Sequence, residues 1–152
     1  MGGGRQEKSN VDRIIPMNGF LDSSMIVRYL TGDPPDLAEQ AAGIIDGQAE
    51  LLVTDVVLIE TAYVLISVYK IARSIVVDHL VALLQKENIS PFTLNKGVVL
   101  QALLLCRASG SVSFADSMVW AAARSSNTKT VYSLDERFPS DGIEIRRQAE
   151  PK

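Results

Sequence analysis

Four acidic residues spread along the chain are the side chains best suited to chemistry. They are Asp22, Glu60, Asp116 and Asp135. Two of them follow short apolar runs, one lies inside an apolar stretch, and one comes near the start of a helical pattern. Carboxylates in such places can bind a divalent cation, but they can also cap a helix or face solvent.

Glu60 is the most informative of the four. It is the only formally charged residue between Val56 and Tyr69, in a predicted helix that reads as buried. An ionised carboxylate in apolar surroundings is costly unless it is paired or binds a cation. The alternative is a narrow exposed stripe or an ion pair, although a solvated helix face would normally carry more polar residues.

The other three acids have strong structural alternatives. Asp22 precedes Ser23 and could cap the helix that follows. Asp116 completes a Ser-x-x-Asp pattern with Ser113, which is typical of a capping box. Asp135 lies in the sequence SLDERF, where it could be a turn residue or another cap. Taken singly, each is as consistent with a structural role as with catalysis.

Together, the four carboxylates would require a cation. Two carboxylates about 4 Å apart repel by about 4 kcal/mol at an effective dielectric constant of 20, so a bare cluster would shift toward protonation. Mg²⁺ or Mn²⁺ prefers such oxygen ligands and keeps waters that can be activated. Such a metal lowers the pKa of water and stabilises the charge that develops in phosphodiester hydrolysis. The acids therefore indicate metal-dependent hydrolysis of phosphodiesters, provided that the fold brings them together.

Short apolar runs alternate with helical patterns, and these elements must position the acids. Strands are predicted at 19–22, 51–54, 89–92, 128–134 and 142–147, and helices at 23–30, 36–46, 55–70, 73–87, 95–109 and 113–127. Strands separated by helices predict an α/β fold, a three-layer α/β/α sandwich with a central, mostly parallel sheet. Sites in such sheets form beyond the carboxyl ends of the strands, which places Asp22 and Asp135 on one rim.

Local signals indicate where the helices begin and end. Gly32 and the proline pair after it are expected to end the first helix. Asp36 is expected to cap the second helix, with Gly47 past its end. The helix that contains Glu60 is expected to be capped by Thr54 or by the aspartate that follows it.

The 152 residues fit a single domain. Residues 1–18 are Gly-rich and polar and predict a flexible extension, followed by a domain at 19–148 and a tail at 149–152. No apolar run reaches the roughly 18–20 residues of a membrane span, and the first ten residues lack the apolar segment of a signal peptide. A single cysteine, Cys106, cannot form an internal disulfide, which is typical of a cytoplasmic protein.

The charge balance argues against a protein that binds duplexes through a basic surface. Fifteen basic residues against eighteen acidic ones give a net charge of −3, whereas such proteins usually carry a basic excess. A nuclease is still compatible with this charge, because acids gathered at a metal site lower the net charge while the metal supplies local positive charge.

Four segments around the acids resemble PIN-domain ribonucleases, most closely the VapC-type toxins of toxin–antitoxin systems. FLDSSMIVRYL is similar to the opening strand and helix of the family, and VTDVVLIETAYVL to its segment with a glutamate in an apolar helix. SFADSMVWAAAR is similar to the helix that supplies the third acid, and TVYSLDERF to the closing strand and turn. The resemblance covers roughly residues 19–146.

This resemblance implies a PIN-like fold and a Mg²⁺- or Mn²⁺-dependent endoribonuclease that hydrolyses RNA, with the same four acids as metal ligands. It also implies that Ser24 and Ser133 orient a carboxylate or water, although the family more often has threonine at the second position. Toxin members are neutralised by an antitoxin whose tail occupies the acidic groove, and they are usually homodimers.

Two other functions are consistent with parts of the pattern. A PIN-fold module that binds RNA or protein with weak catalysis would keep the fold, but retention of all four acids argues against it. An aspartyl-phosphate phosphatase would also place an acid at a strand end. Such enzymes typically carry a second acid two residues later, where this chain has Ser24.

Overall fold

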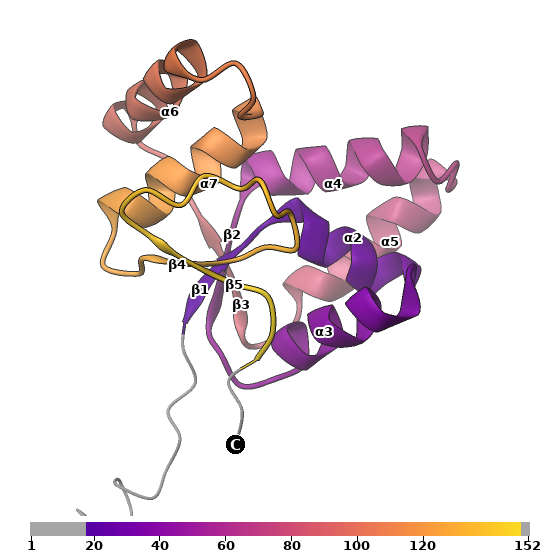
Figure 1. Cartoon of the computed structure of the whole chain (residues 1–152). Coiled ribbons are helices and arrows are strands. Elements are labelled where there is room, and N and C mark those ends of the chain that lie inside the picture. The colour runs from indigo at the N-terminus through magenta and orange to yellow at the C-terminus, as the bar shows by residue number, and fades with distance from the viewer. Residues whose placement is uncertain (1–17, 150–152) are drawn as a thin grey trace, which may run out of the picture.

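Five parallel strands form the central sheet of the computed structural model, which describes residues 18–149 (Figure 1). The strands are β1 (Gly19–Leu21), β2 (Leu51–Thr54), β3 (Ile89–Phe92), β4 (Thr130–Tyr132) and β5 (Glu144–Arg146). Their order is β3-β2-β1-β4-β5, and every neighbouring pair is parallel. The predicted extension and tail lie outside the described residues, apart from Asn18 and Ala149.

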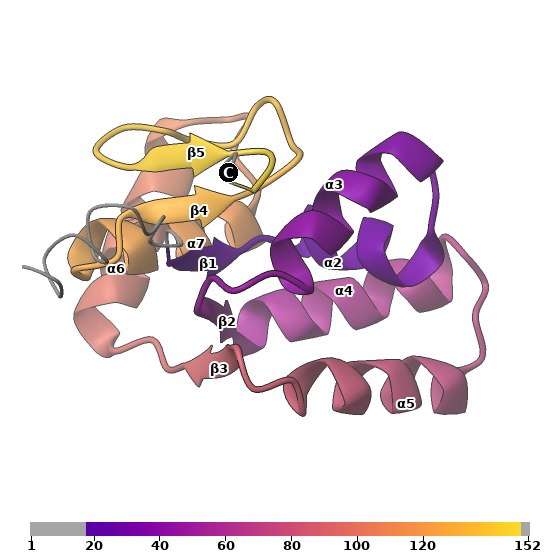
Figure 2. The same ribbon diagram turned by 90° about the horizontal axis from the view of Figure 1, so that it is seen from below.

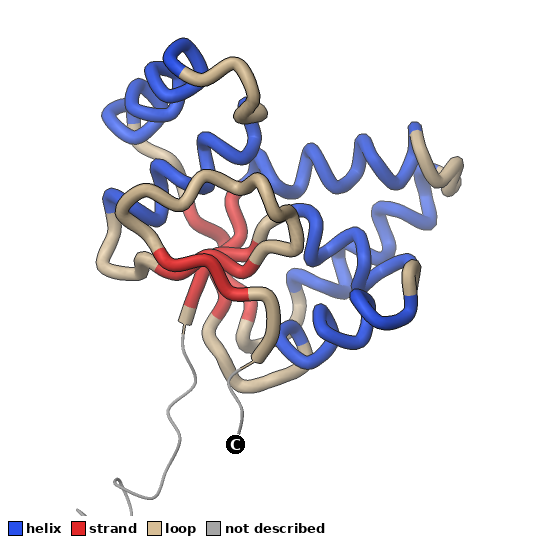
Figure 3. Tube along the Cα trace, in the orientation of Figure 1, coloured by secondary structure: helices blue, strands red, loops and turns tan. Residues whose placement is uncertain are grey.

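Within residues 18–149, six helices flank the sheet. They are α2 (Ser23–Thr31), α3 (Pro35–Ile45), α4 (Asp55–Ser67), α5 (Arg73–Leu84), α6 (Lys96–Ala108) and α7 (Phe114–Ser125). Figure 2 shows α6 and α7 on one side of the strands and α2 to α5 on the other. The tube in Figure 3 shows helices above the strands and to their right. The predicted α/β architecture with a parallel sheet is therefore confirmed.

The helix ends follow local chemistry, with one correction. Gly32 ends α2 in the left-handed conformation, at φ 71°, and its N–H donates to the Arg28 carbonyl. Thr54 caps α4, since its side chain accepts a hydrogen bond from the Val57 N–H. The prediction that Asp36 caps the second helix is wrong, because α3 already begins at Pro35. Proline suits the first helical position, where its fixed φ fits and its missing N–H costs nothing.

A common core anchors the elements that carry the acids. Met25 of α2, Val57 of α4 and Val119 of α7 are buried in the same apolar cluster as Phe20 and Val131 of the sheet. Each acid of the predicted site therefore lies within one or two turns of a residue that is packed in this core. Such packing limits how far the carboxylates can move apart.

One face of α4 is exposed, although its composition predicts a buried helix. Val57, Thr61 and Leu65 pack inward at helical spacing, whereas Ile59 and Tyr63 are each 70% exposed. The expectation that the whole helix is buried is therefore wrong. The scarcity of charge around Glu60 reflects an exposed apolar stripe as well as a core face.

No helix among residues 18–149 is both long enough and apolar enough to cross a membrane.

Candidate metal centre

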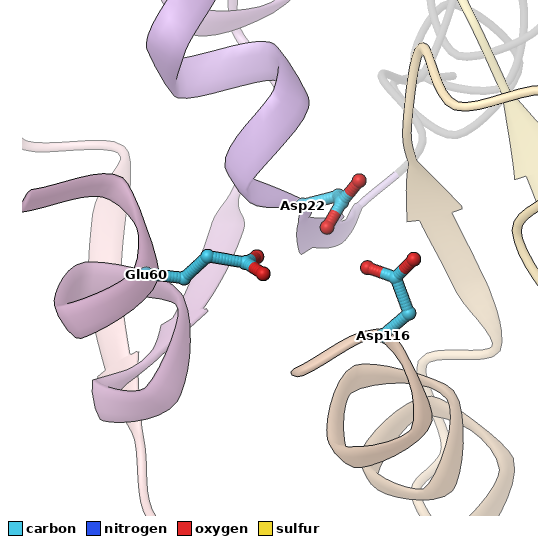
Figure 4. A group of neighbouring side chains, drawn as sticks. All are labelled: Asp22, Glu60 and Asp116. Atoms are coloured by element: carbon cyan, nitrogen blue, oxygen red, sulfur yellow. The ribbon is translucent and has the colours of Figure 1, made fainter. Parts of the chain in front are cut away.

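Three of the four predicted acids meet at the carboxyl end of the sheet. Asp22 follows β1, Glu60 lies in α4, and Asp116 lies in the first turn of α7. Each offers one carboxylate oxygen, and these three oxygens lie within 4.8 Å of one another. Figure 4 shows the three side chains pointing into one shared space. Ligands on opposite sides of a divalent cation are about 4–5 Å apart, so this group could hold such an ion.

Asp22 is the most buried member of the group, at 2% exposure. Its Oδ2 accepts hydrogen bonds from Ser24 Oγ at 2.9 Å and from Ser133 Oγ at 2.8 Å. Its Oδ1 is buried and accepts no bond from an N–H or hydroxyl group among the described residues. A buried carboxylate oxygen without a partner is costly, so the arrangement leaves one oxygen for a cation or a proton.

The capping alternative for Asp22 does not hold for its side chain. The residue occupies the N-cap position of α2, but its carboxylate makes no capping hydrogen bond. The carboxylate instead belongs to a network of hydroxyl groups. Ser24 Oγ accepts from the Leu134 N–H at 2.9 Å, and Ser133 Oγ accepts from the Asp135 N–H at 3.1 Å. This network ties the start of α2 to the chain that leaves β4.

Glu60 is positioned by a residue that the sequence analysis did not single out. The buried Ser23 donates a hydrogen bond from Oγ to Glu60 Oε1. Two neighbouring serines therefore serve two different acids, Ser23 bonding to Glu60 and Ser24 to Asp22. The Asp-Ser-Ser sequence is visible in the chain, but the partner of Ser23 depends on how α2 packs against α4.

Asp116 combines a structural role with a place in the cluster. Its backbone N–H donates to Ser113 Oγ at 3.0 Å, so half of the predicted capping box is present. Its carboxylate is turned toward Asp22 and Glu60 (Figure 4). The backbone of Asp116 thus secures the helix start, and its side chain is left for the shared space.

Asp135 borders the cluster without joining the close group of three. Its Oδ1 accepts a hydrogen bond from the Arg137 N–H at 2.9 Å, which is the turn role that its sequence allows. Its negative charge nevertheless contributes to raising the pKa of both Glu60 and Asp116. Its role as a metal ligand therefore stays a prediction.

Burial and mutual repulsion make the cluster hard to ionise fully. Burial is the main cause that raises the pKa of Asp22, against the hydrogen bonds from Ser133 and Ser24. Burial likewise raises the pKa of Glu60, with the Ser23 bond acting in the opposite direction. Burial, and then the charges of the neighbouring acids, raises the pKa of Asp116 to about 8.

A proton on Asp116 lets this residue donate a hydrogen bond to Asp22, which lowers the pKa of Asp22 and raises that of Asp116. At neutral pH, the cluster without a cation therefore retains a proton.

The raised pKa of Asp116 predicts how the stability of the metal-free protein depends on pH. A carboxyl group with a raised folded-state pKa stabilises the fold in full below its ordinary pKa of 3.8, and this contribution is lost as the pH rises through about 8. With a chelator present, we expect Asp116→Asn to melt above the wild type near pH 8, by roughly 2–4 °C for a difference of about 1 kcal/mol. Differential scanning calorimetry between about pH 4 and pH 8 measures this difference.

Asp78→Asn is the matched control, because Asp78 is an exposed acid on α5. Its melting temperature should follow that of the wild type across the range. A pH-independent difference between Asp116→Asn and the wild type would show that Asp116 ionises normally.

Three solved structures with the same fold are a toxin or toxin–antitoxin proteins. The toxin VapC20 of Mycobacterium tuberculosis, described as cleaving the sarcin–ricin loop, is 19% identical with a TM-score of 0.67, over 82% of this chain and 95% of that chain. VapBC2 of Rickettsia felis, bound to a promoter DNA fragment, is 14% identical with a TM-score of 0.61, over 86% and 98%. A toxin–antitoxin complex of Klebsiella pneumoniae is 10% identical with a TM-score of 0.56, over 80% and 89%. At these identities, the likeness shows the fold alone.

No curated protein sequence is significantly similar to this chain. The model of the PIN domain family does match it, over residues 19–140. The matched segment begins at β1 and includes all three acids of the close group as well as Asp135. From this match over most of its length, and from the PIN-like arrangement of sheet and helices, the chain belongs to the PIN domain family.

Proposed function

We propose that this protein is a divalent-metal-dependent endoribonuclease, acting as the toxin of a toxin–antitoxin pair. The observation that carries the proposal is the buried Asp22 carboxylate: its Oδ1 accepts no hydrogen bond from an N–H or hydroxyl group of the described residues, and one of its oxygens lies within 4.8 Å of two further carboxylates. The likeness to VapC20, described as a toxin that cleaves the sarcin–ricin loop, supports RNA as the substrate.

The donor set fits Mg²⁺ or Mn²⁺ better than softer metals. The close group consists of carboxylates alone, and hard oxygen ligands favour these ions over zinc or copper. Asp22, Glu60 and Asp116 would hold the ion, and we propose Asp135 as a fourth ligand at the edge of the cluster. When bound, such a cation lowers the pKa of water and offsets the charge that develops on the phosphodiester.

The residues around the acids prepare them for this task. Ser24 and Ser133 both donate to Oδ2 of Asp22, which fixes the orientation of this carboxylate and leaves Oδ1 without a hydroxyl partner. Ser23 holds Oε1 of Glu60, so that this longer side chain has one preferred position. Groups that orient metal ligands in this way commonly change metal affinity or activity by about 10–100-fold when they are removed.

RNA cleavage by matched variants tests the proposal. We expect Asp116→Asn and Asp22→Asn to lose Mg²⁺-dependent cleavage to the background level, because each removes a charged ligand while preserving its size. Ser133→Ala should retain activity that is reduced by about 10–100-fold. Asp78→Asn on α5 should cleave as the wild type does. The measurement is cleavage of structured RNAs with Mg²⁺, with Mn²⁺ and with a chelator.

Titration calorimetry with Mn²⁺ separates the proposal from a weakly catalytic binding module. The wild type should bind the ion with measurable heat, and Asp116→Asn should not. Full RNA cleavage by purified Asp116→Asn would remove the catalytic assignment. RNA binding by the wild type with neither heat from Mn²⁺ nor cleavage would favour the binding module.

We further propose that two copies associate through the exposed apolar surface of α4, α6 and the start of α7. Ile59 and Tyr63 of α4, Leu104 of α6 and Phe114 of α7 are all highly exposed, and α7 packs against both other helices. Monomeric proteins rarely expose large apolar patches of this kind. A second copy of the chain, presenting the same surface, would cover it.

Sedimentation velocity tests the dimer. The wild type should sediment as a dimer and the double variant Tyr63→Glu, Leu104→Asp as a folded monomer, because charges would be buried at the interface. Val81→Asp, at an exposed apolar position on α5, is the control and should remain dimeric. A monomeric wild type, or loss of the dimer in the control alone, would contradict this surface.

A neutralising partner protein completes the proposal. The similar structure from Klebsiella pneumoniae is a toxin–antitoxin complex, which supports a partner of that kind. A basic tail would suit the acidic cluster, and an apolar helix would suit the exposed Ile75, Val77 and Val81 of α5.

We expect the neighbouring reading frame to encode a small protein with a DNA-binding fold and a basic tail. The measurements are co-purification of that protein with this chain and the loss of RNA cleavage in the complex. If the encoded protein neither binds this chain nor inhibits cleavage, it is not the neutralising partner.

A further inference from the structure

An open hollow of about 410 Å³ lies next to the acidic cluster, beyond the ends of β4 and β5. It is lined by Asp135, Glu136, Phe138, Ser140, Ile145 and Arg147. Its size is within the range of about 300–1,000 Å³ that is usual for small-molecule sites. Because Asp135 borders both this hollow and the acidic cluster, a chain-like substrate could occupy the two together.

Arg147 is placed on the same rim as the acids by the topology of the sheet. It is the first residue after β5, which pairs in parallel with β4, which in turn pairs in parallel with β1. The carboxyl ends of these three strands therefore open at one edge. Asp22, Asp135 and Arg147 each follow one of these ends, so the arginine extends the rim one strand beyond Asp135.

The Arg147 side chain is half-buried and held at one end. Its Nη1 donates to the Leu134 carbonyl at 3.0 Å, and the Leu134 N–H in turn donates to Ser24 Oγ. The guanidinium is thus linked through one residue to the hydroxyl network around Asp22. Since a guanidinium has five N–H donors, most of its hydrogen-bonding capacity is left for another partner.

Arg147 makes no ion pair with the acids beside it. The ion pairs among residues 18–149 are Lys86–Asp46, Arg124–Asp141 and Arg146–Glu144. The adjacent Arg146 is therefore paired, whereas Arg147 lines a hollow together with two acids and bonds to a neutral carbonyl. A positioned cation of this kind is suited to phosphate, which arginine binds through two parallel N–H bonds.

The charge of the protein gives this cation a particular importance. With a net charge of −3, the chain has no general basic excess that would attract a polyanion. The cluster itself is acidic, so it repels the phosphates on either side of the bond to be cleaved. Individual cations at defined places on the rim must then hold the RNA backbone.

We propose that Arg147 binds the phosphate of the nucleotide adjacent to the scissile bond, and that the hollow beside it holds this nucleotide. The inference rests on the proposed ribonuclease function. It adds a substrate-binding residue that lies outside the acidic cluster.

RNA binding in a non-cleaving background tests the inference. The probe is a fluorescently labelled RNA hairpin with single-stranded flanks, and Asp116→Asn provides the background. Adding Arg147→Met should weaken binding by about tenfold, the loss expected for one hydrogen-bonded charge contact. It should also reduce the slope of log Kd against log salt concentration by about one, because one phosphate contact disappears.

Lys129→Met is the matched control. It removes the same charge from the residue before β4, at the opposite end of the strands, and should change neither the affinity nor the slope. Arg147→Lys retains the charge and should keep the salt slope while losing part of the affinity. In the otherwise wild-type enzyme, Arg147→Met should raise KM and leave kcat nearly unchanged.

Equal RNA affinity and salt slope in Arg147→Met and Lys129→Met would overturn the inference. A loss of affinity with an unchanged slope in Arg147→Met would overturn it too, since that pattern indicates a structural effect. If Arg147→Met does not fold, Arg147→Lys takes its place as the test. Because lysine keeps the charge, a reduced salt slope in Arg147→Lys would also overturn the inference. Absence of cleavage by the wild type would contradict the ribonuclease proposal, whereas the binding assay, which needs no cleavage, would still show whether Arg147 contacts an RNA phosphate.

Discussion

Repulsion among partly buried carboxylates is the constraint around which this structure is organised. Asp22, Glu60 and Asp116 project from three different elements into one space, and burial disfavours the charged form of each. Such a group can hold a proton, move apart or bind a cation. The surrounding packing opposes the second outcome, because the helices and strand that carry the acids share one core. The protein therefore keeps an unfavourable arrangement that a cation would relieve, which is the usual pattern when stability is sacrificed at a functional site.

Serine hydroxyl groups hold the carboxylates of the cluster in place. Ser24 and Ser133 satisfy one oxygen of the buried Asp22 and leave the other without a hydrogen-bond partner among the described residues. Ser23, the neighbouring residue in the chain, donates to one oxygen of Glu60. Serine is suited to this task because it is small enough to be buried and supplies one donor without adding charge. None of the ion pairs of residues 18–149 joins a lysine or arginine to these acids, so the carboxylates are left for a cation or a proton.

Charge and apolar surface are separated around the acidic rim. The carboxylates occupy the rim, Arg147 stands one strand beyond Asp135, and the exposed apolar side chains lie on the helices that flank the sheet. Such a division suits a protein whose substrate is a polyanion and whose protein partners bind through helices. The same division accounts for a composition that is both acidic overall and rich in apolar residues. The apolar residues do not form a membrane span, because no helix of the described chain is suited to crossing a membrane.

The sequence by itself determined how strands and helices alternate along the chain, and with that the parallel sheet, because both follow from local periodicity. It also determined the rim on which Asp22 and Asp135 lie, because sites in such sheets form beyond the carboxyl ends of the strands. Only the tertiary structure decided which carboxylates approach one another, that Asp135 stands at the edge, and that Ser23 serves Glu60. It also decided that one face of α4 is exposed and that α3 begins at Pro35 rather than being capped by Asp36. A pattern along the chain shows how residues repeat within one element, whereas contacts between residues far apart in sequence depend on how the elements pack. Arg147 illustrates the difference, since nothing in its local sequence distinguishes it from Arg146, and only the sheet places it beside the acids.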